Sequence, residues 1–240
     1  PPERAPGRVV AGQRAHEHAR RVGQQLHQVA ARHRHPLEIA HYVDHLLAVF
    51  DTIGAQRVHL SGESLGGWVA ARLASDHPDR IERLVLNTAG GSQADPEVMK
   101  RIITLSMAAA QNPDWDTVQA RIKWLMADKS KGYDDIVASR QKVYQLPGFA
   151  AAMSDIMALQ DPVIRARNLL GPAEYGAITA PTLVLWTSDD PTADVSEGRR
   201  ISEMIPGARF EVMPGCGHWP QYEDAKSFDR LHIDFLLGRS

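Results

Sequence analysis

The 240-residue chain has little of what marks several large protein classes. It contains one cysteine, so an internal disulfide framework is excluded and a reducing compartment is expected. No apolar run approaches the roughly 18 residues of a membrane helix, and we expect no secretory signal. The formal net charge of −2 supplies no strong field for nucleic acid or anionic lipid. We therefore expect a cytoplasmic protein that acts on a small molecule, with no nucleic-acid or membrane partner, and we leave a homo-oligomer open.

Hydrophobic residues make up 43% of the chain, enough for one domain with an insertion. Residues 1–35 differ from the rest, because they carry seven arginines, five of the eleven histidines and only two acids. We expect an exposed basic helix there. His33 and His35 have no carboxylate or cysteine partner nearby in the sequence, so we expect no metal site. Because the chain begins at Pro1, its start is expected to be processed or missing.

The most informative stretch is the run Gly-Glu-Ser-Leu-Gly at residues 62–66. A short apolar run precedes it and a helix rich in small residues follows, which is the strand, turn and helix of a nucleophile elbow. Such a tight turn exposes the Ser64 hydroxyl, and glycines on both sides allow strand and helix to approach closely. The first amide of the helix, Leu65 N–H, then becomes an oxyanion donor at the positive end of the helix dipole.

A serine nucleophile needs a base, and the base needs a group that orients it. His218 follows the apolar run 208–213 in a glycine-flanked loop, and Asp189 and Asp190 follow the apolar run 181–186. Both positions lie at the carboxyl ends of predicted strands, in the order Ser, Asp, His. Spacing alone leaves the two aspartates nearly equal as candidates for the orienting acid.

The apolar periodicity divides the rest of the chain into two kinds of region. Strands and helices alternate over residues 36–92 and 176–240, which predicts a parallel sheet with right-handed crossovers. We expect at least four parallel strands, at 57–60, 81–87, 181–186 and 208–213, that follow one another in space in this order. Residues 93–175 contain helical patterns and no convincing strand, so we expect a helical cap over the elbow. The predicted fold class is therefore α/β, with a parallel sheet, helices on both faces and an inserted cap.

Residues 36–240 resemble the α/β hydrolases, and in detail the hydrolases that cleave a C–C bond in 2-hydroxy-6-oxohexa-2,4-dienoates. The resemblance rests on the elbow, on the motif at 77–81, on the Gly-His-Trp at 217–219 and on the last helix at 231–236. In that family the acid is the fourth residue of a Gly-x-x-Asp after its strand. Thr187 stands at the glycine position here, so the resemblance selects Asp190 over Asp189.

The resemblance also implies two substrate-binding residues. Arg140 matches the cap arginine that holds the dienoate carboxylate, a task that suits a bidentate guanidinium. Trp219 matches an aromatic residue that lines the dienoate site. The alternative for Arg140 is a solvated helix charge, and the alternative for Trp219 is plain packing against the cap.

Two departures from the family pattern affect these expectations. The family usually has Asn directly before the nucleophile, where this chain has Glu63, which we expect to repel an anionic dienoate or to pair with a cap cation. The family's early His-Gly, whose loop supplies the second oxyanion donor, does not occur before Pro36. Our hypothesis is that residues 1–35 are a reading-frame error or an unrelated start, and that the N-terminal strands, about four, are missing.

Three functions follow from these residues. The first is a serine hydrolase that splits a C–C bond in a 2-hydroxy-6-oxohexa-2,4-dienoate produced by aromatic ring meta-cleavage. The second is a carboxylesterase with the same Ser64, His218 and Asp190 triad. The third is a non-catalytic, truncated hydrolase. None of the three requires a cofactor or a metal.

Overall fold

The computed structural model describes residues 38–239, and within them four strands form one parallel sheet. In space they follow their sequence order: β1 (Val58–Glu63), β2 (Ile81–Asn87), β3 (Thr182–Thr187) and β4 (Arg209–Met213). This is the succession predicted from the apolar runs. It places the carboxyl ends of all four strands at one edge, so the turns that follow them lie side by side.

Helices cover both faces of the sheet. On one face α3 (Leu65–Asp76) and α10 (Val195–Met204) pack against the strands, and α2 (Ile39–Ile53) packs on α3. On the other face α12 (Ala225–Leu236) covers the strands through the buried Phe235. A 3-10 turn, η1 (Pro78–Arg80), leads into β2.

The residues of the two central strands explain why both faces are covered. In β2, Leu84 and Leu86 pack into the core of α2, α3 and α10, whereas Val85 packs on the α12 side. Every residue of β3 is buried. A near-continuous apolar run is the pattern expected for a strand buried on both faces, so this prediction is confirmed.

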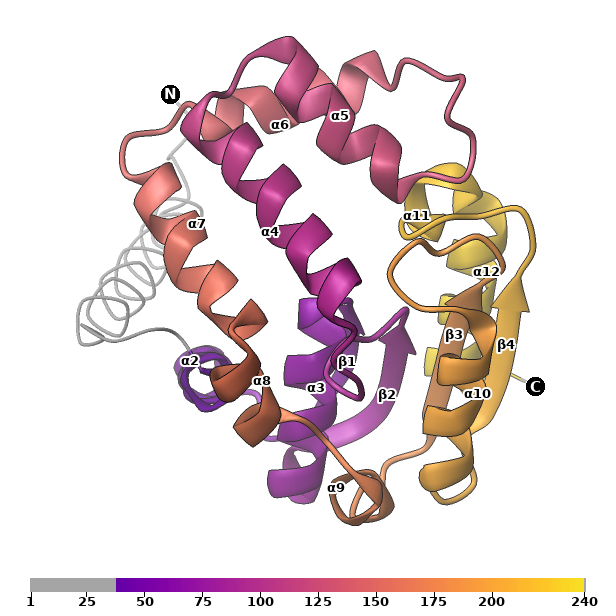
Figure 1. Ribbon diagram of the computed structural model, residues 1–240. Coiled ribbons are helices and arrows are strands. Elements are labelled where there is room, and N and C mark those ends of the chain that lie inside the picture. The colour runs from indigo at the N-terminus through magenta and orange to yellow at the C-terminus, as the bar shows by residue number, and fades with distance from the viewer. Residues whose placement is uncertain (1–37, 240) are drawn as a thin grey trace, which may run out of the picture.

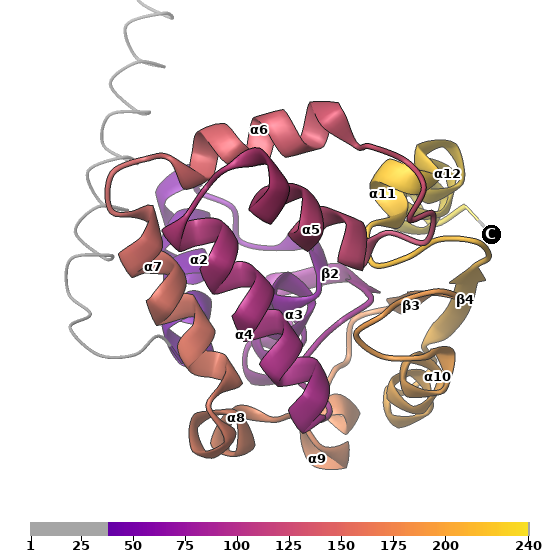
Figure 2. The same ribbon diagram turned by 45° about the horizontal axis from the view of Figure 1, so that its top comes forward.

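The chain between β2 and β3 is helical, as expected for residues 93–175, and we call it the insertion. Figure 1 shows its first helices beyond the carboxyl ends of the strands and its last helix at the opposite end of the sheet. Figure 2 shows the same first helices from a view turned by 45°. It contains α4 (Pro96–Gln111), α5 (Trp115–Leu125), α6 (Asp134–Tyr144), α7 (Phe149–Met157), η2 (Ala158–Gln160), α8 (Pro162–Asn168) and α9 (Pro172–Gly176).

The insertion has an apolar core of its own, made of one side of each of its first helices. Val118, Ile122, Val137 and Met153 are buried in that core, together with smaller residues of α4. Its last part joins the main core instead, because Leu159 packs with α2 and α3. The insertion is therefore a separate layer, and its C-terminal part anchors it to the sheet domain.

Two short helices, α9 and α11 (Pro220–Glu223), were not predicted, because four or five residues are too few for an apolar period to show. The predictions for residues 1–35 lie outside the described residues, as do those on the missing strands. In residues 38–239, no helix is long and apolar enough to cross a membrane. The same residues contain no cluster of histidine, cysteine or carboxylate side chains that could hold a metal ion.

Candidate active site

Ser64 lies in the turn between β1 and α3 with a positive φ of 53°. A non-glycine residue pays a steric cost for this conformation and keeps it only where the surroundings impose it. The amide of Ser64 donates to Asn87 O at 3.1 Å, and its carbonyl accepts from Gly90 N at 2.9 Å. The turn is thus held by the exit of the neighbouring strand β2.

Two glycines let the elbow close. A Cβ on Gly62 would overlap the carbonyl of Gly66, and a Cβ on Gly67 would lie 2.6 Å from Ala89 Cβ. A Cβ on Gly66 would meet nothing within 4 Å. We expected Gly62 and Gly66 to allow the close approach of strand and helix. This is correct for Gly62 and wrong for Gly66. Gly67 makes the space, because the helix turns its second glycine toward the exit of β2.

Leu65 is the first residue of α3, where a backbone N–H has no partner inside the helix. Its amide is therefore free to stabilise an anion beside Ser64, at the positive end of the helix dipole. The predicted loss of a second donor concerns the chain before Pro36 and lies outside the described residues.

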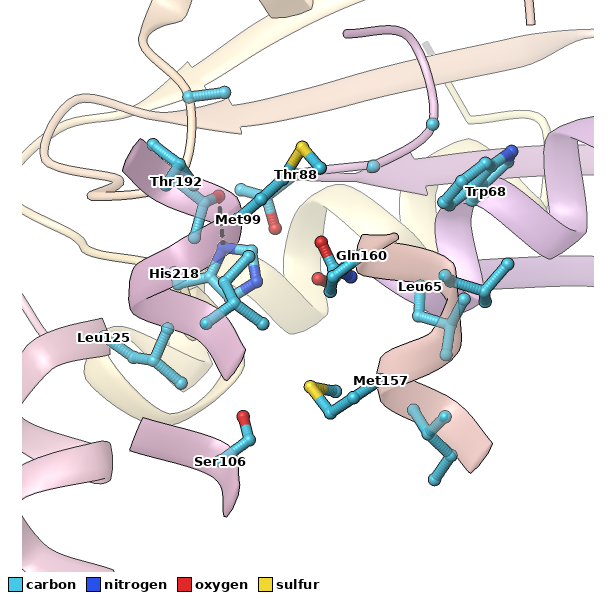
Figure 3. A pocket seen from close by; sticks show the side chains of 18 of the residues that line it. Leu65, Trp68, Thr88, Met99, Ser106, Leu125, Met157, Gln160, Thr192 and His218 are labelled. Atoms are coloured by element: carbon cyan, nitrogen blue, oxygen red, sulfur yellow. Dashed lines mark hydrogen bonds between the residues drawn. The ribbon is translucent and has the colours of Figure 1, made fainter. Parts of the chain in front are cut away.

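His218 is 4% exposed and lies close to Asp190. Its Nδ1 donates to Asp190 Oδ2 at 2.8 Å. The other carboxylate oxygen, Oδ1, accepts from the backbone N–H and from the hydroxyl of Thr192, both at 2.7 Å. The Thr192 hydroxyl oxygen also lies 3.3 Å from His218 Nδ1, and Figure 3 shows this contact. Both carboxylate oxygens of Asp190 are satisfied, which fixes its orientation toward the imidazole.

The alternative acid, Asp189, is placed differently. Its carboxylate accepts from the Ser188 hydroxyl at 2.6 Å, and its amide donates to Cys216 O at 3.0 Å. No hydrogen bond joins Ser64 to His218 among the residues described, although both line the same cavity. Hydrogen bonds of catalytic groups are often long without substrate and tighten when it binds.

The insertion is tied directly to the loop that carries His218. The amide of His218 donates to Leu125 O at 2.7 Å, and a Cβ on Gly217 would overlap that carbonyl. The Glu223 carboxylate accepts from Ala127 N at 2.7 Å and from Gly217 N at 2.6 Å. The position of the imidazole therefore depends on the end of α5.

A cavity of about 270 Å³ lies between the elbow and the insertion. Figure 3 shows apolar side chains from the insertion, Leu125 and Met157 among them, around the space next to His218. Three arginines also belong to its wall: Arg121, Arg140 and Arg165. The cavity thus combines apolar volume with positive charge.

Arg140 and Trp219, the two substrate-binding residues predicted by resemblance, both line this cavity. The Arg140 guanidinium carbon lies 4.9 Å from the centre of the Trp219 ring, a cation–π contact. Within residues 38–239, Arg140 makes no hydrogen bond or ion pair. Trp219 also packs against the apolar core of the insertion, so the packing alternative holds for it as well.

Glu63 does not line the cavity. Its carboxylate accepts a hydrogen bond from the Gln221 amide on α11, and burial raises the pKa of Glu63, which favours its neutral form. The charges of His218, Asp190 and Arg140 also influence this pKa, so the Glu63 carboxylate lies close to residues of the site. A contact between Glu63 and the substrate stays a prediction.

The sequence profile of the alpha/beta hydrolase fold matches residues 14–225 of the chain. The chain belongs to the alpha/beta hydrolase fold family. The fold predicted from the sequence is thereby confirmed, and the elbow, the histidine loop and the acid lie where strands of this hydrolase fold end.

Among its relatives, this alpha/beta hydrolase is 30% identical over 204 residues to a 2-hydroxy-6-oxononadienedioate/2-hydroxy-6-oxononatrienedioate hydrolase of Cupriavidus pinatubonensis, covering 80% of this chain and 66% of that protein. It is 31% identical over 194 residues to a 2-hydroxy-6-oxo-6-phenylhexa-2,4-dienoate hydrolase of Burkholderia cepacia, covering 79% and 66%. The chain thus spans slightly under two thirds of the length of these relatives.

Solved structures show the same fold. The meta-cleavage product hydrolase CumD of Pseudomonas fluorescens IP01 aligns with a TM-score of 0.74 and 23% identity, over 86% of this chain and 74% of that one. The enol-lactonase of Burkholderia xenovorans LB400 aligns with a TM-score of 0.68 and 24% identity, over 84% and 74%. At these identities the likeness concerns the fold alone.

Thr192 and Arg121 are among the polar residues of the cavity wall that sequence reasoning missed. Thr192 lies two residues after Asp190, so a threonine or serine in that loop was the available signal. Arg121 lies in an amphipathic helix whose charged residues look alike in the sequence. Only its burial in the folded structure distinguishes it from its neighbours.

Proposed function

We propose that this protein is a serine hydrolase that cleaves the C–C bond of a 2-hydroxy-6-oxohexa-2,4-dienoate, the type of product formed by meta-cleavage of aromatic rings. One observation carries the proposal: the cavity lined by Ser64 and by His218, which is bonded to Asp190, is also lined by Arg140, whose guanidinium has no hydrogen bond or ion pair within residues 38–239. The names of the relatives supply the dienoate. The single cysteine is in keeping with a reducing compartment, so a cytoplasmic location is part of the proposal. The proposed reaction also uses no cofactor.

The proposed reaction adds one water across one C–C bond. The dienol first shifts a proton from its 2-hydroxyl to C5 and becomes the ketone. Ser64, or a water that it activates, then adds to the C6 ketone while His218 takes the proton. Leu65 N–H stabilises the resulting oxyanion. The C5–C6 bond breaks, and its electron pair passes through the C3–C4 double bond to the 2-oxo oxygen, which takes the proton back from His218 and gives a 2-hydroxypentadienoate. If water added, C6 leaves as the carboxylic acid; if Ser64 added, C6 stays as an ester of Ser64, which a water activated by His218 then hydrolyses to the carboxylic acid.

The remaining residues have supporting roles in this proposal. Asp190 orients His218 and stabilises its charged form, and Arg140 with Trp219 receives the dienoate carboxylate and chain. The insertion acts as the cap that excludes water from the reacting carbon.

An activity assay tests the proposal by comparing variants of the triad, and of Asp190 with those of its neighbour Asp189. The yellow dienolate should lose its absorbance when the enzyme is added. Ser64→Ala and His218→Ala should abolish this activity, and Asp190→Asn should lower kcat about 10⁴-fold, as in other triads. Asp189→Asn, one residue away, should retain activity within a few-fold. Equal losses for the two aspartates would contradict the assignment of the acid.

Arg140 tests the substrate class. Arg140→Ala should lower kcat/KM on the dienoate by roughly 30- to 1000-fold, because one charge-assisted pair away from water is lost. Turnover of a neutral aryl ester should change only a few-fold. Ester turnover without any loss of dienolate colour in the unmodified protein would favour the carboxylesterase. If folded protein also fails to react with a fluorophosphonate at Ser64, the non-catalytic alternative holds.

A further inference from the structure

Arg121 lines the cavity with a guanidinium whose hydrogen-bonding capacity is only partly used. Its Nε donates to the hydroxyl of Ser106 at 3.1 Å, and its guanidinium carbon lies 5.7 Å from the centre of the Trp124 ring. Its Nη1 is buried and has no hydrogen-bond partner in the described part of the chain. A buried charged donor without an acceptor is costly, so this nitrogen indicates a missing anionic group.

The other two arginines of the cavity wall differ from Arg121 in how their hydrogen-bond donors are used. Arg165 is more fully bonded, since its Nε donates to the carbonyl of Gln93 and its Nη1 to the side chain of Gln160, and none of its nitrogens is buried without a partner in the described residues. Arg140 stacks on Trp219 and, within residues 38–239, forms no hydrogen bond or ion pair. Arg121 and Arg140 are therefore the two guanidinium groups with donors to spare.

These two arginines lie near one another. Arg121 is on α5 and Arg140 on α6, and the two helices pack together. Burial lowers the pKa of the Arg121 guanidinium, and the positive charge of Arg140 acts in the same direction, whereas Glu63 opposes both effects. The Glu63 carboxylate is hydrogen-bonded to Gln221. Within residues 38–239 it forms no hydrogen bond or ion pair with Arg121 or Arg140, so two cations share one region of the cavity and neither has a bound carboxylate.

We propose that Arg121 is a second carboxylate-binding residue of this site, and that Arg121 and Arg140 together receive one carboxylate of the substrate. The proposal deepens the proposed function and depends on it only for the identity of the ligand as a dienoate. A carboxylate offers about four lone-pair sites on two oxygens, enough for the edges of two guanidinium groups. Ser106 holds the Nε edge of Arg121 and thereby directs the remaining donors. Figure 3 shows Ser106 beside the cavity, between Leu125 and Met157 in that view.

A binding measurement tests this without any need for turnover. The probes are hexa-2,4-dienoate and its uncharged amide, which lack the 6-ketone and so cannot be cleaved, and calorimetry gives the Kd of each. We expect the unmodified protein to bind the acid at least about tenfold more tightly than the amide, and Arg121→Met to weaken binding of the acid by about 10- to 100-fold. Arg140→Met should act similarly. Lys123→Met, which removes a charge from the same helix outside the cavity wall, should change neither Kd.

Three outcomes would overturn the proposal. The unmodified protein could bind the acid no more tightly than the amide. Alternatively, Arg121→Met could have the same Kd for the acid as Lys123→Met. Arg121→Met could also leave the monoacid unaffected and weaken only hexa-2,4-dienedioate, in which case the two arginines hold separate carboxylates. Should Arg121→Met fail to fold, Arg121→Lys keeps the charge without the planar fork and should weaken the acid by a smaller factor. Failure of dienoate cleavage with intact acid binding would refute the proposed function and leave the Arg121 assignment standing.

Discussion

At the scale of single residues, the carboxylates of the site are oriented by neighbouring side chains that hydrogen-bond to them. Asp190 faces His218 because the amide and hydroxyl of Thr192 occupy its other oxygen. The Glu63 carboxylate is held by a hydrogen bond from the side-chain amide of Gln221. Each of these partners lies in a loop or a short helix, so each can be removed without deleting the group that it positions.

Thr192 is expected to act as a positioning residue for the acid. Thr192→Val keeps the shape of the side chain but removes the hydroxyl donor, so one charge-assisted hydrogen bond to Asp190 is lost. We expect kcat to fall about tenfold with little change in KM, because substrate contacts remain. Thr192→Ser keeps the hydroxyl and should restore kcat in steady-state assays. A rise in KM without a fall in kcat would instead make Thr192 a substrate contact.

Glu63 should make stability depend on pH. Burial raises its pKa above the usual 4.5, so between these two values the folded state binds more protons than the unfolded state. The free energy of unfolding therefore falls as pH rises through that window. Glu63→Gln removes this effect and supplies an amide donor for Gln221 Oε1, which is buried and has no hydrogen-bond partner within residues 38–239.

Thermal unfolding measures the consequence. The gain in Tm from Glu63→Gln should be larger at about pH 8 than at about pH 5, with about 2–4 °C for each kcal/mol. Glu203→Gln is the control, because Glu203 is exposed on α10 and its replacement should not change the pH dependence. The same shift at both pH values for Glu63→Gln would contradict a raised pKa.

At the scale of elements, the close approach of β1, α3 and the exit of β2 determines the geometry of the nucleophile. Ser64 is bound through its backbone to Asn87 and Gly90. Gly67 allows α3 to approach Ala89 in that same segment. The strained φ of Ser64 is therefore maintained by packing between three elements.

Substitution of the two adjacent glycines separates packing from helix propensity. Gly67→Ala should cost about 1–3 kcal/mol in the free energy of unfolding, because the new methyl group meets Ala89 at 2.6 Å. It should also slow fluorophosphonate labelling of Ser64, because Ala89 belongs to the segment that holds the elbow. Gly66→Ala meets nothing within 4 Å and should be neutral or stabilising by up to about 1 kcal/mol. Urea denaturation of both variants checks this, and a larger loss at Gly66 would be the contrary result.

At the scale of the whole molecule, the insertion and the sheet domain are joined at both ends of the insertion. Arg165 lies on α8, near the C-terminal end of the insertion. It donates to Gln93 O at 2.9 Å, and Gln93 lies at the beginning of the insertion. Its guanidinium carbon lies 5.0 Å from the centre of the Trp68 ring on α3. One buried cation thus connects the beginning of the insertion, its end and the helix that follows the nucleophile.

Arg165 should therefore contribute more to stability than its neighbour on the same helix. Arg165→Met leaves buried carbonyl groups without donors and should cost about 2–3 kcal/mol in urea denaturation. Arg167→Met is the matched control, because Arg167 makes an exposed ion pair with Glu38 that solvent screens, so its loss should change stability little. Equal losses for the two variants would show that the buried network adds nothing beyond surface charge.

The sequence by itself determined most of the elements, the order of the four strands and the place of the elbow. These features depend on apolar periodicity, on turn residues and on the handedness of crossovers, all of which act between residues near one another in the chain. The family of relatives could be inferred from the same motifs.

Only the tertiary structure decided where particular side chains point. It placed Asp190 rather than Asp189 against His218, as the resemblance to relatives had suggested and spacing alone had not. It also joined Glu63 to Gln221 and buried the Nη1 of Arg121 in the cavity wall. The reason is physical: such orientations are set by contacts between α5, α6, α11 and the strand ends, which come together from distant parts of the chain.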